Sequence, residues 1–118
     1  QLLHKPAEAP KLEFIFIHAD YSLMKIMLED ILYIEGLKDY IKIHLRTQKF
    51  PVVCRMTMKS IEEKLPSDQF FRVHKSYIVS IKKMESIRNQ KIKIGENHIP
   101  LSENFADQFM QAIGYSKS

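Results

Sequence analysis

Basic and hydroxyl side chains lie between apolar residues in the segment FFRVHKSYIVSI, residues 70–81. These polar residues are Arg72, His74, Lys75 and Ser76. Lysine and arginine neutralise backbone phosphates and release condensed counterions, while hydroxyl and imidazole groups form hydrogen bonds that fix the register on a duplex. The segment therefore predicts a surface for phosphates and base edges. The alternative is an amphipathic segment whose charges are only solvated.

Charge is distributed unevenly along the chain, although the net charge of +4 is modest. Residues 36–50 carry four Lys or Arg against one Asp or Glu, and residues 72–93 carry seven against one. The flanks are acidic, with a charge of −3 over residues 1–35 and −2 over residues 94–118. Two basic segments between acidic flanks predict a binding surface for a polyanion, provided that they meet on one face after folding.

The size and composition of the chain indicate one globular domain. It has 118 residues, of which 45% are hydrophobic and 27% charged, so a core can form without a metal or a disulfide. The sequence contains no long uncharged apolar run and predicts no membrane span. Cys54 is the only cysteine, which excludes an internal disulfide and is typical of the reducing cytoplasm.

Residues 1–11 have the composition of an interdomain linker, because HKPAEAP contains two prolines and no apolar period. We expect the folded domain to cover residues 12–118. The chain starts with Gln1 rather than an initiator methionine and shows no signal-peptide pattern. We therefore expect it to be a fragment of a longer protein.

Short runs rich in aliphatic and aromatic residues predict strands through most of the chain. They lie at residues 13–18, 22–28, 30–36, 40–46, 50–55, 84–88, 91–94 and 98–101. The run YIKIHLR, residues 40–46, alternates imperfectly in the manner of a half-buried antiparallel strand, and its polar face should be basic. Pro51 suggests that the next strand lies at a sheet edge.

A first short helix is predicted where the apolar period changes from two to nearly four. Met58, Ile61 and Leu65 form its buried face. Thr57 is a plausible N-cap and Pro66 follows the helix end.

A second helix is predicted near the C-terminus, with Ser102 as its N-cap and Gly114 at its end. Phe105, Phe109 and Ile113 should form its buried face. The fold class is therefore mainly β with one or two short helices. Short strands joined by tight turns exclude a parallel α/β sheet.

Enzyme chemistry is not indicated by the residues. The five histidines have no HxxxH, HExxH or Cys–His ligand spacing, so no metal site is predicted. Cys54 lies in a strand-like run, where a buried structural thiol is the default interpretation. The three glycines form no glycine-rich loop that could hold a nucleotide phosphate. We predict neither catalysis nor a cofactor.

The order of the elements, together with three motifs, resembles the LytTR-type DNA-binding domain found at the C-terminus of bacterial response regulators. The motifs are LEDILYIEGLKDYIKIHL, MTMKSIEEKLPSDQFFRVHKSYIVSI and IPLSENF. The resemblance covers about residues 12–113, and the FxRxHxSyiV pattern inside the second motif is its most specific part. It implies an elongated all-β fold, in agreement with the class predicted from the residues.

The resemblance implies that loops on a rigid β scaffold, rather than a recognition helix, reach successive grooves of double-stranded DNA. Asp39, Lys75 and Glu103 occupy the positions that contact bases in the family. Many members carry arginine where this chain has Glu103, and a carboxylate cannot replace the two donors of arginine at guanine. Either another base is read there, Asn104 takes over, or Glu103 only lies in the first turn of a helix.

Phosphate contacts are expected from basic and hydroxyl side chains around these positions. They are Lys38, Lys42, Arg72, His74, Ser76, Lys82, Arg88, Lys91 and Lys93. Lys75 is favoured for a base edge, with a phosphate contact as its alternative. Aromatic residues of the central motif are expected in the core, which disfavours stacking on single-stranded RNA.

The resemblance further implies a two-component transcription factor, with a receiver domain upstream in the same chain and a sensor histidine kinase that acts on that receiver. Two copies would read imperfect direct repeats as a homodimer joined chiefly through the receiver. The isolated domain would be mostly monomeric. The alternative from another class is a protein-interaction module that uses an exposed strand edge and has no role at DNA.

Overall fold

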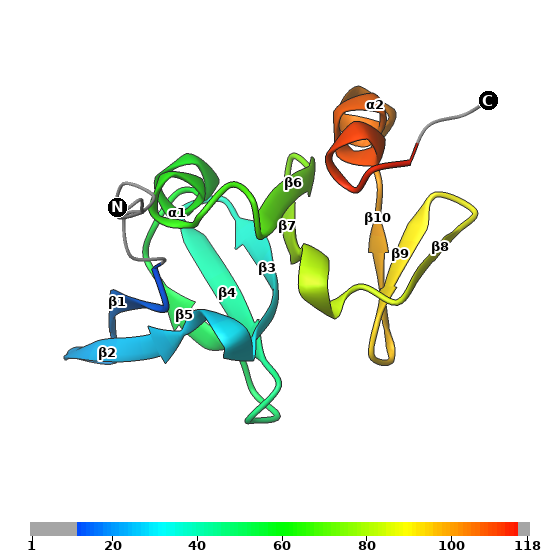
Figure 1. Cartoon of the computed structure of the whole chain (residues 1–118). Helices are drawn as coiled ribbons and strands as arrows, with labels where there is room; N and C mark the ends of the chain where they lie inside the picture. The colour runs from blue at the N-terminus through cyan, green and yellow to red at the C-terminus, as the bar shows by residue number, and fades with distance from the viewer. Residues whose placement is uncertain (1–11, 116–118) are drawn as a thin grey trace, which may run out of the picture.

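A computed structural model describes residues 12–115 of the chain. Its centre is a five-stranded antiparallel sheet with the strand order β5-β4-β3-β7-β6 (Figure 1). The strands are β3 (Ile31–Leu37), β4 (Tyr40–Leu45), β5 (Val52–Cys54), β6 (Phe70–His74) and β7 (Tyr77–Ser80). Apolar alternation along β4 buries Ile41 and Ile43 on one face and leaves Lys42 and His44 half-buried on the other.

A first hydrophobic core joins this sheet to an N-terminal hairpin and a short helix. The hairpin consists of β1 (Phe14–Ala19) and β2 (Ser22–Met27), and the helix is α1 (Met58–Lys64). Ile17 of β1 and Ile61 of α1 pack with Ile34 of β3 in this core. The helix begins where Thr57 Oγ1 accepts a hydrogen bond from the amide of Ser60 at 3.0 Å, which confirms the predicted N-cap.

A second hydrophobic core joins the opposite face of the large sheet to a smaller sheet and a C-terminal helix. The smaller sheet has the order β10-β9-β8, formed by β8 (Ser86–Arg88), β9 (Lys91–Ile94) and β10 (Asn97–Pro100). The helix is α2 (Glu103–Ala112). Phe109 of α2 is fully buried among Val73, Val79, Ile92 and Ile99. This core fixes α2 beside β6.

The mainly β fold class is confirmed, and β5 lies at a sheet edge as Pro51 suggested. The predicted buried face of the second helix is partly wrong, because only Phe109 is fully buried, whereas Phe105 and Ile113 are half-buried. The physical reason is that the Phe105 ring lies towards the guanidinium of Arg72, at 6.0 Å, outside the second core. The linker expected at residues 1–11 lies outside the described residues.

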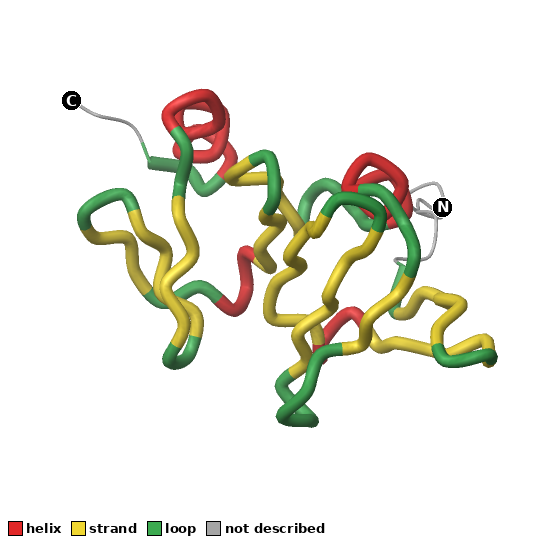
Figure 2. Tube along the Cα trace, turned by 180° about the vertical axis from the view of Figure 1, so that it is seen from behind, coloured by secondary structure: helices red, strands yellow, loops and turns green. Residues whose placement is uncertain are grey.

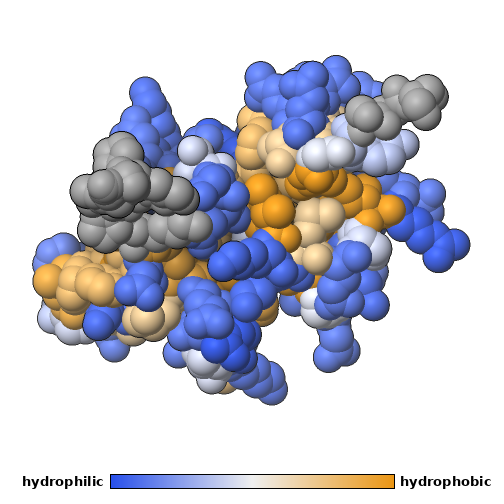
Figure 3. All heavy atoms as spheres, in the orientation of Figure 1, coloured by the Kyte–Doolittle hydropathy of each residue, from blue (hydrophilic) through white to orange (hydrophobic). Residues whose placement is uncertain are grey.

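The α-helices α1 and α2 lie at the same end of the molecule, as the view from behind shows (Figure 2). The outer side of the β1–β2 hairpin carries the exposed apolar side chains Phe16, Leu23 and Met27. Apolar surface is visible over this hairpin at the left of the space-filling view (Figure 3). Within residues 12–115, no helix is both long and apolar enough to cross a membrane.

Candidate nucleic-acid interface

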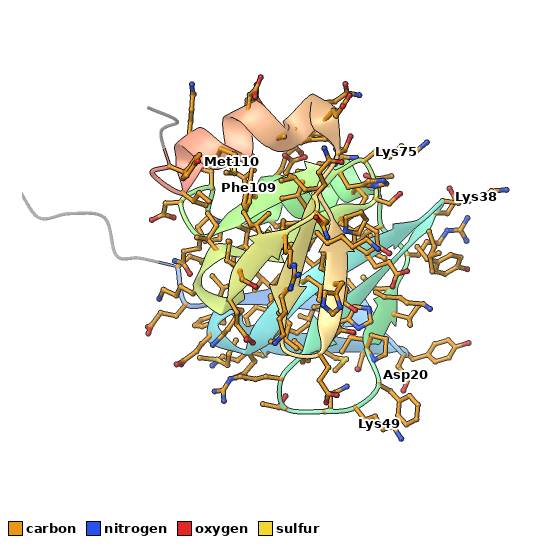
Figure 4. All side chains as sticks on the ribbon, turned by 90° about the vertical axis from the view of Figure 1, so that its right-hand side faces the viewer. Asp20, Lys38, Lys49, Lys75, Phe109 and Met110 are labelled. Atoms are coloured by element: carbon orange, nitrogen blue, oxygen red, sulfur yellow. The ribbon has the colours of Figure 1, made fainter. Side chains whose placement is uncertain are left out.

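Two turns that each carry a lysine meet at one end of the large sheet. Lys38 and Asp39 connect β3 to β4, while Lys75 and Ser76 connect β6 to β7. Because β3 pairs with β7, the amide of Gly36 donates to the carbonyl oxygen of Ser76 at 2.8 Å. The side chains of Lys38 and Lys75 point outward on the same side of the molecule (Figure 4). Residues from both basic segments of the sequence therefore lie together.

Gly36 allows α1 to pack closely against the start of the first turn. A Cβ atom at this position would lie 2.6 Å from Cγ and 2.8 Å from Sδ of Met58, closer than non-bonded atoms approach. The absence of a side chain thus lets Met58 cover the end of β3. In the turn itself, Lys38 adopts a left-handed conformation with φ 50°, which is uncommon for a residue with a Cβ atom.

The N-terminus of α2 lies beside these turns. The amide of Ser102 donates to the carbonyl oxygen of Val73 at 2.8 Å, just before the β6–β7 turn. Glu103 and Asn104 follow at once and are exposed. We call the two turns with residues 38–39 and 75–76, together with the start of α2 at residues 103–104, the contact end. It contains every residue that was predicted to contact a base edge.

The peptide group between Lys75 and Ser76 is held at both of its polar atoms. Arg72 Nη2 donates to the carbonyl oxygen of Lys75 at 2.6 Å, and the amide of Ser76 donates to His74 Nδ1 at 3.0 Å. Because Nδ1 accepts, the proton of a neutral His74 ring lies on Nε2. The exposed Lys75 side chain therefore projects from an ordered turn.

Arg72 and His74 were expected to contact phosphates, but the structure uses both inside the protein. Besides its bond to Lys75, the Arg72 guanidinium donates from Nη1 to Glu62 Oε1 of α1 at 3.3 Å. His74 is half-buried and its ring meets the Tyr77 ring edge-on, with the centroids 5.6 Å apart. Neither side chain is freely available at the surface.

The polar face of β4 differs from the basic face expected from the sequence. Lys42 lies opposite Glu35 of β3, and His44 Nε2 is 3.2 Å from Glu35 Oε1. The His44 ring also stacks on Tyr33, with a centroid separation of 4.2 Å. Burial, reinforced by the charge of Glu35, raises the pKa of Tyr33 and of Tyr77, so both phenols stay neutral at neutral pH. This face is a packed polar layer.

The outer face of the small sheet is basic and open. Arg88 lies opposite Lys91, and Lys93 lies opposite both Ser86 and His98. With Asn89, these residues line a depression of about 600 Å³. Lys93 Nζ lies 3.8 Å from Glu85 Oε1, a long contact between exposed side chains. The β8–β9 turn approaches α2, because the amide of Leu101 donates to the carbonyl oxygen of Gln90 at 2.9 Å.

Lys82 is separated from the other candidates. β7 runs from Tyr77 at the contact end to Ser80 at the opposite end of the sheet, where Lys82 follows in a short 3-10 turn. There it lines a groove of about 470 Å³ together with Glu13 and Glu29. The structure therefore does not place Lys82 with the contact end, and its surroundings are acidic.

Residues 21–114 match the family model of the LytTr DNA-binding domain. The chain belongs to this family. The sensory transduction protein LytT of Enterococcus faecalis is 26% identical over 115 residues, and that of Bacillus cereus is 30% identical over 99 residues. These matches cover 92% and 78% of this chain but 47% and 39% of the relatives. The chain thus spans less than half the length of the curated relatives that it matches.

The fold of this LytTr domain is also found in a solved LytTr DNA-binding domain from Bacillus cereus, with a TM-score of 0.73. The similarity covers 89% of this chain and 100% of that chain, at 16% sequence identity. At this identity the likeness shows the fold alone. The roles of individual side chains must therefore come from the geometry of this LytTr domain itself.

Two residues of the LytTr domain lie at the candidate interface although the sequence patterns did not point to them. His98 shares the basic face of the small sheet, which only the pairing of β9 with β10 reveals. Glu62 of α1 contacts Arg72, with 3.3 Å between Glu62 Oε1 and Arg72 Nη1. The spacing within one motif could not indicate these partners, because each comes from a different element.

Proposed function

We propose that this LytTr domain binds double-stranded DNA in a sequence-specific manner through its contact end. The observation that supports the proposal is that two turns and the start of α2, from distant parts of the sequence, converge there with exposed polar side chains. Lys75 is suited to donate to O6 or N7 of guanine, and Asp39 to accept from the amino group of cytosine. Glu103 or Asn104 would read a third position.

Phosphate contacts are assigned to cationic or hydroxyl groups in or near these turns. The exposed Lys38 and the half-buried Ser76 lie in the two turns, and Arg88, Lys91 and Lys93 extend the basic surface onto the small sheet. Such contacts neutralise phosphates and make the affinity depend on salt, without carrying sequence information. Lys42 and His74 are weaker candidates because both are half-buried, and Lys82 is left out of the proposed interface because it follows the opposite end of β7.

We further propose that the domain is the output module of a response-regulator transcription factor. The greater length of the LytT proteins and their description as sensory transduction proteins support this proposal. An upstream receiver domain, phosphorylated by a sensor histidine kinase, would join two copies on a direct repeat. The isolated domain would act in the cytoplasm as a monomer without enzymatic activity and would bind one half-site weakly.

Selection of bound duplexes from a random DNA pool tests the proposal, at both low and moderate salt. Enrichment of a short motif by the unmodified domain is expected, and Lys75→Ala should weaken that enrichment. Lys82→Ala is the matched control, since it removes the same charge far from the contact end. Retention of DNA without any enriched motif, even when a dimerising domain is fused upstream, would contradict sequence-specific binding.

A second candidate function is protein interaction, favoured by the exposed apolar side of the β1–β2 hairpin. Phe16, Leu23 and Met27 are 46%, 57% and 39% exposed. An apolar interface loses little affinity as salt rises, whereas counterion release makes DNA binding fall steeply. Substitution of Leu23 by Ser should leave DNA binding intact in the first proposal and remove partner binding in the second.

A further inference from the structure

Arg72 joins three elements that meet at the contact end. Its Nη2 donates to the carbonyl oxygen of Lys75 at 2.6 Å, and its Nη1 donates to Glu62 Oε1 of α1 at 3.3 Å. The guanidinium carbon lies 6.0 Å from the centre of the Phe105 ring in α2. β6, which carries Arg72, lies between the two helices (Figure 1).

The Arg72 guanidinium has little freedom to bind a DNA phosphate in addition to its partners within the protein. The Arg72 side chain is 25% exposed, and its Nε is inaccessible to solvent. A phosphate could take two parallel hydrogen bonds from Arg72 only if the guanidinium left the carbonyl of Lys75 and the carboxylate of Glu62. Breaking those charge-assisted bonds in a half-buried site opposes such a movement.

The bond from Arg72 acts on the backbone of Lys75, the residue that the proposed function assigns to a base edge. The carbonyl of Lys75 and the amide of Ser76 belong to one peptide group, and the amide is held by His74 Nδ1 at 3.0 Å. Holding both polar atoms of this group fixes the backbone dihedrals on either side of it. The direction in which the Lys75 side chain leaves the turn is thereby fixed as well.

We propose that Arg72 is a positioning residue: it holds the Lys75–Ser76 peptide so that Lys75 is presented to a base edge, and it does not itself bind phosphate. This inference rests on the proposed function. Preorganisation of the turn lowers the conformational entropy lost on binding and aligns the ammonium group with its acceptor. Nonspecific attraction to the polyanion does not need that alignment.

The two roles of Arg72 predict different binding data for Arg72→Gln. If Arg72 is a positioning residue, the variant domain loses at least about fivefold affinity for the preferred site and much less for unrelated duplexes, and its salt slope is unchanged. If Arg72 contacts a phosphate, the variant domain loses the same affinity for all duplexes, and the magnitude of its salt slope falls by about 0.9. Equal losses with a reduced slope would overturn the proposal.

The second test measures whether the effects of Arg72→Gln and Lys75→Ala on DNA affinity are coupled. A general loss of stability would not produce such coupling. If Arg72 acts through Lys75, Arg72→Gln should cost little in a Lys75→Ala background, whereas independent contacts give additive losses. Arg72→Lys should fail to restore discrimination, because one ammonium group cannot span the carbonyl of Lys75 and the carboxylate of Glu62. Additive losses, or full rescue by lysine, would overturn the proposal.

Glu62→Ala tests the same arrangement without removing Arg72, should Arg72→Gln fail to fold. It removes one hydrogen-bond partner of the guanidinium. Discrimination between the preferred site and unrelated duplexes should therefore weaken, but by less than with Arg72→Gln. Glu63→Ala is the matched control, because Glu63 is the exposed neighbour on α1. Equal effects of the two substitutions would show that Arg72 does not depend on Glu62 for its position.

Amide hydrogen exchange of the free domain separates this inference from the proposed function. Arg72→Gln should speed exchange at Ser76, while amides of β9, in the second core, keep their protection. If no DNA motif were enriched even with a dimerising domain fused upstream, the proposed function would fail, yet exchange at Ser76 would still decide whether Arg72 holds the turn. Unchanged exchange at Ser76 would overturn the inference.

Discussion

The amide of Gly36 donates a hydrogen bond to the carbonyl oxygen of Ser76 across 2.8 Å. This bond joins the end of β3 to the turn between β6 and β7, next to the pairing of Glu35 with Tyr77. It brings the turn with Lys38 and the turn with Lys75, one from each basic segment of the sequence, together at one end of the sheet. The charge pattern in the sequence could not show that these two turns meet.

Lys75→Ala should cost about 1 to 3 kcal/mol in binding to the preferred site and flatten discrimination at one base pair. The reason is that Lys75 is exposed on an ordered turn of the contact end. Titration of the preferred duplex and of its single-base variants measures both effects. An equal loss on every duplex would assign Lys75 to a phosphate instead.

Glu103→Arg should change the preferred sequence and leave the fold intact. The side chain is exposed in the first turn of α2, where a positive charge costs about 0.3 to 1 kcal/mol through the helix dipole. Selection from a random DNA pool would show the new preference. Asp107→Arg, an equal charge change at another exposed position of α2, should not alter it. An unaltered motif for Glu103→Arg would show that this position reads no base.

Removing the cations of the small sheet should weaken binding equally on all sequences. When Arg88, Lys91 and Lys93 are replaced by Gln, the salt slope should fall by about 0.9 for each phosphate that is no longer neutralised. The preferred motif should not change, because phosphate contacts carry no direct sequence information. Salt titrations with two unrelated duplexes measure this, and Lys82→Gln serves as the control. A slope equal to that of the unmodified domain would exclude this face from the interface.

Gly36→Ala should destabilise the domain by about 1 to 3 kcal/mol, because the new methyl group would overlap Met58. In a Met58→Ala background the same change should cost little, since the overlapping atoms are gone. Urea unfolding of the four proteins gives the coupling. The same loss in both backgrounds would place the strain in the β3 backbone rather than in its contact with Met58.

Stability should fall in alkaline solution, in part because burial raises the pKa of the Cys54 thiol above its ordinary value of 9.0. The pKa of the thiol is higher in the folded state than in the unfolded state. The resulting stabilisation is fully present below pH 9.0 and is lost as the pH rises through the pKa of the folded state. Tyr33 and Tyr77 act likewise above their ordinary value of 10.0.

Cys54→Ala removes the titrating thiol, so its deficit in unfolding free energy relative to the unmodified domain should shrink as pH rises above about 9. Urea unfolding at several pH values measures this deficit. A constant deficit would mean that the thiol does not contribute to the alkaline loss of stability, and the two tyrosines would then account for it.

Much of the fold follows from local patterns. The alternation in YIKIHL and the change of period after Thr57 predict β4 and α1 without tertiary information, because burial on one face demands those periods. The burial of Phe105 could not be predicted in the same way. Its helix face is apolar in sequence, but the neighbour that it meets is Arg72, which comes from another strand.

The candidate interface was predictable in its residue types and not in its arrangement. Lys75 and Glu103 were singled out by motif, and the structure places both at the contact end. Arg72, His74 and Lys82 were equally plausible phosphate contacts in sequence. Whether a polar side chain faces solvent, a carboxylate or the backbone depends on elements distant in the chain. The surroundings of these three side chains therefore differ in a way that their types do not indicate.

The sequence by itself determined the strand and helix periods, the position of the two basic segments and the motifs of the LytTr family. Those properties depend on residue type and short-range spacing. Only the tertiary structure decided that Gly36 and Ser76 are bonded, that Arg72 is turned inward to Lys75, and that Lys82 lies at the far end. The physical reason is that hydrogen-bond partners and exposure arise from strand pairing and packing between segments remote in sequence.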